Sequence, residues 1–176
     1  MKKHILLIAL LLISITAFSQ VKIGYANLEF ILRNFPEAQQ MNRDVEEYQN
    51  VLEEQIAAKQ TYYQSLLEDY YAKQQEGYAE SLLQSMGEQI VALEQEIQTD
   101  LTNAEIKLGK YSAQKLEPIT QKIIDAINVI YEEEGYTYIL NSADGTGNSI
   151  VLRGPEADNV TYRILDKLGV EIDKNE

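Results

Sequence analysis

A long run of helical spacing is the feature that most constrains how this chain can fold. Between residues 37 and 134 the sequence contains one proline, Pro118, and three glycines. Apolar residues recur there at steps of three and four, as in a heptad seam. In the second half they are Leu83, Met86, Ile90, Leu93, Ile97, Leu101, Ala104, Leu108 and Tyr111. One step of four is repeated, which is a stutter. A narrow apolar stripe on polar helices predicts a two-helix coiled coil rather than a globular core.

The first half of this run carries a weaker seam, interrupted at Lys59 and Gln60. Its members are Met41, Val45, Tyr48, Leu52, Ile56, Tyr63, Leu67 and Tyr70. One unbroken helix of such length would be unusual, so we expect the chain to fold back on itself. Pro36 and Pro118 bracket the region and Gly77 lies midway between them, which predicts an antiparallel hairpin over residues 37–117 with its tip near Gly77. A reversal nearer Gly87 is the alternative.

Strand-like segments lie only at the two ends of the chain. VKIGYA begins at Val21, YTYIL spans Tyr136–Leu140, and SIVL spans Ser149–Leu152. A short final helix follows, rich in apolar residues after Asn159. The sequence therefore predicts an α+β fold that is mostly α: a small β body (residues 20–36 and 118–176) and the long helical hairpin. Three short strands make a small core, which favours association with identical copies. The residues predicted for the body and its self-contacts are Ile23, Tyr25, Leu28, Ile31, Tyr138, Leu140 and Val151.

Residues 1–19 have the features of a secretory signal peptide. Lys2 and Lys3 precede an apolar run, and Ala17 and Ser19 lie three and one residues before the expected cleavage ahead of Gln20. An uncleaved anchor is the alternative. Cleavage would leave a net charge of −15, which disfavours nucleic acid and anionic lipid surfaces as partners. With no cysteine in the chain, an exported protein would depend on packing or assembly instead of disulfides.

The sequence offers little material for catalysis. Its one histidine, His4, lies in the predicted signal peptide, and there is no cysteine, phosphate-binding GxxxxGK[ST] loop or GxSxG elbow. Adjacent glutamates such as Glu46 and Glu47 are typical of a solvated helix face. The segment Asn141–Ser149 lacks the DxDxDG pattern of a calcium loop and is interpreted as a glycine-containing turn. We expect no enzyme activity, cofactor or metal; a carboxylate-based hydrolase is the least favoured alternative.

Tyrosine is the other bias, with 12 in the chain. Doublets occur at Tyr62–Tyr63 and Tyr70–Tyr71, and only one member of each can face a helical seam because neighbours point about 100° apart. The other tyrosine of each doublet either covers the hairpin surface or forms part of a contact surface for unfolded protein. Tyrosine suits such a surface because it offers apolar area at little conformational entropy. The predicted contact residues are Tyr62, Tyr71, Tyr78 and Met86.

In the order of these segments, the chain resembles the Skp/OmpH family of periplasmic chaperones. The resemblance is carried by the segments Lys22–Leu32, Tyr136–Leu140 and Asn159–Leu168, and it covers essentially the whole chain after the predicted signal peptide. It implies a homotrimer whose strands form a common β body, with helical hairpins around a cavity. It also implies an ATP-independent holdase in the periplasm that binds unfolded outer-membrane proteins and prevents their aggregation.

The charge of the chain departs from the family pattern. The best-known members are strongly basic, whereas residues 37–117 here contain 16 acidic and 6 basic side chains. This argues against lipopolysaccharide binding and against capture of acidic clients by charge. Two further alternatives to a chaperone remain at this stage. One is an envelope coiled-coil scaffold that binds a specific folded partner, and the other is a monomeric or dimeric coiled coil without chaperone activity.

Overall fold

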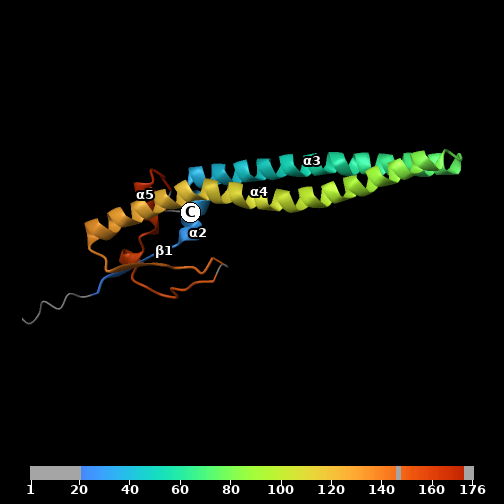
Figure 1. The fold of residues 1–176 in the computed structure, drawn as a ribbon. Coiled ribbons are helices and arrows are strands. Elements are labelled where there is room, and N and C mark those ends of the chain that lie inside the picture. Colours follow the sequence, from blue (N-terminus) through green and yellow to red (C-terminus); the bar gives the residue numbers. More distant parts are fainter. Residues whose placement is uncertain (1–20, 146–147, 173–176) are drawn as a thin grey trace, which may run out of the picture. The chain divides into compact units, whose positions relative to one another are not determined.

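The computed structural model describes residues 21–145 and 148–172 (Figure 1). Its elements are β1 (Ile23–Ala26), α2 (Leu28–Asn34), α3 (Pro36–Gln75), α4 (Glu80–Glu134), β2 (Tyr138–Asn141), the 3₁₀ helix η2 (Glu156–Asp158) and α5 (Thr161–Lys167). They form two compact units. The hairpin unit is Leu32–Lys122, and the body unit combines the residues up to Ile31 with those from Ile123 onward. The α+β, mostly helical fold is therefore confirmed. The predicted signal peptide lies outside the described residues.

Local rules explain where α3 begins and ends. Pro36 occupies its first turn, where a missing backbone N–H costs nothing. At the other end Gly77 adopts a φ of +77°, the left-handed conformation that glycine adopts without strain. The N–H of Tyr78 bonds to the carbonyl of Lys73 at 3.1 Å and that of Gly77 to Gln74 at 3.3 Å, which is the Schellman arrangement. The chain thus reverses at Gly77, and Gly87 lies inside α4.

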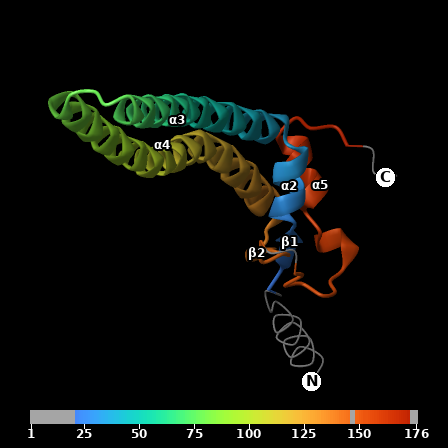
Figure 2. The ribbon, with the colours of Figure 1, turned by 90° about the vertical axis from the view of Figure 1, so that its right-hand side faces the viewer.

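A narrow apolar seam joins the two helices of the hairpin unit, which lie side by side in Figures 1 and 2. Its buried members are Leu52 and Ile56 of α3 and Leu83, Met86, Ile90, Leu93 and Ile97 of α4. Ile56, Leu93 and Ile97 form one cluster, against which Tyr63 and Leu66 pack. Leu101 comes after the repeated step of four and is 40% exposed, because that step turns its side chain away from the seam.

Polar contacts also join the two helices of the hairpin unit. Lys59 reaches from α3 to both Glu96 and Asp100 of α4, and these two hydrogen bonds, that to Asp100 first, raise the pKa of the lysine. Nearer the body-side ends of the helices, Lys115 bonds to Asp44 at 2.7 Å. Where Lys59 interrupts the apolar seam, a polar bridge therefore joins the two helices.

The body unit contains a two-stranded parallel sheet. β1 pairs with β2 in the register Ile23↔Tyr138 and Tyr25↔Leu140. A parallel pair requires a long connection, and residues 27–137 provide it. The expected strand at Ser149–Leu152 does not form in this described segment, where the chain makes an isolated bridge between Ala143 and Ser149 and the N–H of Ile150 bonds to the carbonyl of Ser142 at 2.8 Å. The other side of β1 is occupied instead by Asn159 and Val160, since the N–H of Val160 bonds to the carbonyl of Tyr25 at 2.8 Å.

The core of the body unit is small and aliphatic. Its most deeply buried side chains are Ile31, Ile130, Val160, Ile164 and Leu165. They come from α2, α4 and the region of α5, so segments from both ends of the chain share one core. Within the part of the chain that the structure describes, no helix is both long and apolar enough to cross a membrane.

Candidate functional site

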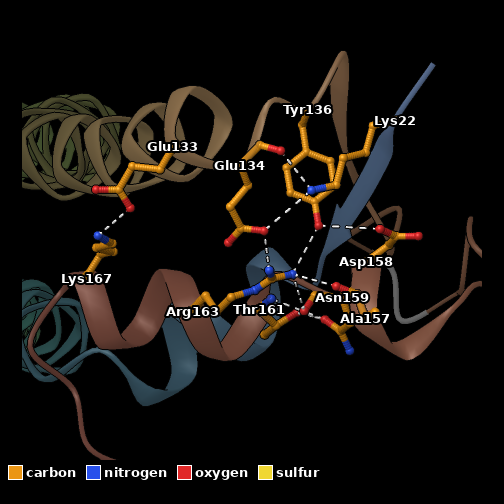
Figure 3. Close-up of polar contacts among 10 residues, drawn as sticks. All are labelled: Lys22, Glu133, Glu134, Tyr136, Ala157, Asp158, Asn159, Thr161, Arg163 and Lys167. Carbon is orange, nitrogen blue, oxygen red and sulfur yellow. Dashed lines mark hydrogen bonds and ion pairs between the residues drawn. The ribbon is translucent and has the colours of Figure 1, made fainter. Parts of the chain in front are cut away.

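A buried tyrosine organises the polar contacts of the body unit (Figure 3). Tyr136 follows α4 and packs against Gly24, where an added Cβ would approach the ring to 3.0 Å. The Nζ of Lys22 lies 3.9 Å from the ring centroid, a cation–π contact. The hydroxyl accepts a hydrogen bond from Arg163 at 3.2 Å and faces Asp158 at 3.5 Å. We call this group of side chains the Tyr136 cluster.

Cations of the same cluster stabilise the end of α4. The last turn of α4 contains three glutamates and no basic residue, which is unfavourable beside the negative end of a helix dipole. Arg163 pairs with Glu134, and Lys167 bonds to Glu133 at 2.8 Å. The Nζ of Lys22 donates to the carbonyl of Glu134 at 2.8 Å. These polar groups satisfy one another, so the cluster is a structural clamp within the body unit.

An apolar surface lies on the outward face of the β1–β2 sheet. Side chains alternate along a strand, so Ile23 and Tyr25 share one face with Tyr138 and Leu140, their partners in the register. Ile23 is 46% exposed, Tyr138 58% and Leu140 46%. Tyr25 is half-buried, and its hydroxyl bonds to the carbonyl of Pro155 at 3.3 Å. Exposed apolar side chains grouped in this way are typical of an association surface. We call these four residues the sheet face.

The other residues predicted for the body divide between core and surface. Ile31 is fully buried and belongs to the core, while Leu28 and Val151 are half-buried. Two further side chains, Ile150 and Leu152, are exposed and were not among the predicted body residues. The spacing of the apolar run in SIVL carries a signal for them, because Ile150 and Leu152 are two residues apart and so share a side of an extended segment.

The predicted contact residues of the hairpin unit differ in exposure. Tyr62, Tyr71 and Tyr78 are 57%, 56% and 47% exposed. Met86 is only 6% exposed because it lies in the seam, so its prediction as a surface contact residue is corrected. Tyr62 and Tyr71 are nine residues apart, which at about 100° per residue places them on opposite sides of α3. The three tyrosines are thus separate apolar points and not one patch.

Acidic side chains outnumber basic ones in the hairpin unit, although the Nζ of Lys73 lies 5.9 Å from the ring centroid of Tyr78. From Gln74 to Ile106 the sequence contains no Lys or Arg. Among the described residues that were searched, no group of His, Cys, Asp and Glu side chains is arranged to hold a metal ion. The hairpin unit therefore presents an acidic surface with isolated exposed aromatic and aliphatic side chains.

Comparison with known proteins gives matches of two kinds. A family model described as outer membrane protein (OmpH-like) matches residues 22–168. The fold is similar to a crystal structure from Caulobacter crescentus, described as that of a "putative outer membrane chaperone (OmpH-like)". The two share 11% sequence identity with a TM-score of 0.73, and the match covers 85% of each chain. Comparison with curated proteins gave no match.

Proposed function

The chain belongs to the OmpH-like family, and from that premise we propose that it is an ATP-independent holdase of the periplasm. It binds unfolded outer-membrane proteins and prevents their aggregation. The observation that carries the proposal is the surface of the hairpin unit, where Tyr62 and Tyr71 of α3 and Tyr78 of the turn expose apolar area. Separate exposed apolar side chains can make weak, repeated contacts with an unfolded chain. A folded ligand would instead be expected to bind at one concentrated site.

Assembly into a homotrimer is the second part of the proposal. The sheet face exposes Ile23, Tyr138 and Leu140. The edge of β2 away from β1 pairs with no further strand in the described part of the chain, so a strand of another copy can pair with it. Association would also bring several hairpin units to one client, which raises the effective concentration of weak contact points. Neither enzyme activity nor lipopolysaccharide binding forms part of this function.

Suppression of aggregation tests the holdase proposal directly. A urea-unfolded outer-membrane barrel protein is diluted into buffer with or without the chain and no ATP, and light scattering is followed. We expect the wild type to suppress scattering and the variant Tyr62→Ser/Tyr71→Ser/Tyr78→Ser to suppress it much less. The matched control Tyr62→Phe/Tyr71→Phe/Tyr78→Phe keeps the apolar area and should act like the wild type. Full suppression by the serine variant would contradict the role of these tyrosines.

The oligomeric mass tests the assembly proposal. Light scattering behind size-exclusion chromatography should give three copies for the wild type and a smaller mass for Ile23→Glu/Leu140→Glu. Exposed positions tolerate such substitutions in an isolated folded chain, so circular dichroism should show the helical signal retained. A monomeric wild type, or a charged variant that remains trimeric, would refute the role of the sheet face. Tight binding to one native protein, without suppression of aggregation, would favour the scaffold alternative.

A further inference from the structure

A groove runs along one side of the hairpin unit between α3 and α4. It consists of two hollows, of about 540 Å³ and about 210 Å³. Besides Gln49 and Thr61, polar side chains line them from both helices: Glu53, Gln60 and Gln64 from α3 and Glu94, Gln98 and Glu105 from α4. On each helix these residues recur at three- to four-residue intervals or multiples of them, so they follow one side of the helix and the two hollows continue each other. We call this surface the glutamate groove.

Apolar side chains lie at the bottom of the glutamate groove, above all in its smaller hollow. The seam residues Ile56 and Ile97 lie beneath it, and Leu101 borders the smaller hollow. Leu101 reaches this surface because the repeated step of four in α4 turns it out of the seam. The stutter in the heptad pattern thus supplies hydrocarbon to a groove whose rims are carboxylates and amides.

The rims carry negative charge that is not neutralised within the chain. No Lys or Arg is among the described residues that line the two hollows. Of the ion pairs that the described part of the chain forms, none involves Glu53, Glu94 or Glu105. The opposite side of the seam differs, because the hollow there is lined by Lys59 and Lys107 together with Asp100. The two sides of the hairpin unit therefore differ in charge.

We infer that the glutamate groove binds an extended polypeptide segment bearing Lys or Arg side chains, so that the preferred clients are cationic unfolded chains. The long hydrocarbon stems of Lys and Arg can lie on the apolar floor while their charged heads reach the glutamates. The amides of Gln60, Gln64 and Gln98 can donate to and accept from a client backbone. This inference rests on the proposed holdase function and adds the class of client.

The dimensions fit such an occupant. The lining of α3 extends from Gln49 to Gln64, about 22 Å of helix at 1.5 Å per residue. An extended chain covers that length with about seven residues at 3.3 Å each. The smaller hollow lies below the 300–1,000 Å³ of ordinary small-molecule pockets. A single long side chain is therefore a better occupant for it than a metabolite.

Peptide binding tests the inference with the whole chain after the predicted signal peptide, residues 20–176. Three labelled, unstructured peptides of equal length and equal tyrosine content would carry four Lys, four Gln or four Glu, and their dissociation constants would be measured by fluorescence anisotropy at low salt. We expect the Lys peptide to bind about tenfold more tightly than the Gln peptide, since each exposed ion pair contributes a few-fold at most. The ratio should fall as salt is added.

Matched variants distinguish an effect of the groove glutamates on peptide binding from an effect of the overall surface charge. Glu53→Gln/Glu94→Gln/Glu105→Gln should lose most of the preference for the Lys peptide. The control Glu47→Gln/Glu68→Gln/Glu117→Gln removes the same charge from exposed positions outside the groove and should retain the preference. Equal losses in both variants, or no preference in the wild type, would overturn the inference.

The aggregation assay distinguishes failure of this inference from failure of the holdase proposal. The groove variant should still hold an unfolded protein of neutral charge as well as the wild type does. If the wild type holds no unfolded protein at all, the holdase proposal fails. If it holds them without regard to their charge, only the inference about the groove fails.

Discussion

Tyr136 allows a graded test of how the body unit is held together. Tyr136→Phe removes only the hydroxyl, and with it the hydrogen bond from Arg163 at 3.2 Å and the long one donated to Asp158 at 3.5 Å. Arg163 keeps its bonds to Glu134 and to the carbonyls of Ala157 and Asn159. The expected loss in the free energy of unfolding is therefore small, about 1 kcal/mol.

Tyr136→Leu should cost considerably more. It also removes the ring beneath Lys22, whose Nζ lies 3.9 Å from the centroid, and the packing of that ring on Gly24. The cation–π contact contributes about 1 kcal/mol, and replacing a buried aromatic side chain with a smaller one leaves a cavity. The total expected loss is about 3 kcal/mol.

Hydrogen exchange of the Val160 amide reports on this unit alone, because that N–H bonds to the carbonyl of Tyr25. At a fixed protein concentration, exchange should be about fivefold faster in Tyr136→Phe and more than a hundredfold faster in Tyr136→Leu. The control Tyr131→Phe alters an exposed tyrosine of the same unit and should change exchange by less than about twofold. Equal effects of the two Tyr136 substitutions, or an equal effect of Tyr131→Phe, would refute the clamp.

Three further predictions concern stability. Gly154→Ala would place a Cβ 2.7 Å from the Tyr25 ring; the ring must move, and urea unfolding should show a loss of about 1–3 kcal/mol. Ile164→Ala empties a fully buried site and should cost about 2–4 kcal/mol in the same assay. The hydrogen bond from Lys115 lowers the pKa of Asp44 below 3.8, so Asp44 stabilises the folded chain above that pH and loses this effect as pH falls through its folded pKa. In Asp44→Asn the melting temperature should therefore decrease less steeply as the pH falls below about 4. The same decrease as in the wild type would contradict the role of the Lys115–Asp44 pair.

Features governed by neighbouring residues could be predicted from the sequence. Pro36 and Gly77 follow rules for the ends of helices that need no knowledge of the rest of the fold. The seam positions followed from spacing alone, and the repeated step of four accounts for the exposure of Leu101. The separation of Tyr62 and Tyr71 onto opposite sides of α3 was also available from their nine-residue spacing.

Features set by tertiary pairing could not be predicted in this way. The carbonyl of Tyr25 could have paired with Ser149–Leu152, but Val160 takes this position and the expected strand does not form in that segment. The Tyr136 cluster joins residues that are more than a hundred positions apart, such as Lys22 and Glu134. Met86 satisfied both the seam pattern and the profile of a contact residue, and only packing assigns it to the seam.

The distribution of charge in the hairpin unit explains how so acidic a surface remains compatible with a stable pair of helices. Lys59, Lys115 and Lys122 each contact a carboxylate on the opposite helix, so these cations hold the hairpin together. The carboxylates that remain, among them those of the glutamate groove, lie on the surface where water solvates them at little cost. Binding of a cationic segment would bring positive charge to these carboxylates, because the lysines of the hairpin unit named above are engaged between its two helices. The same charge balance predicts that added salt weakens client binding more than it weakens the hairpin, whose apolar seam is not screened.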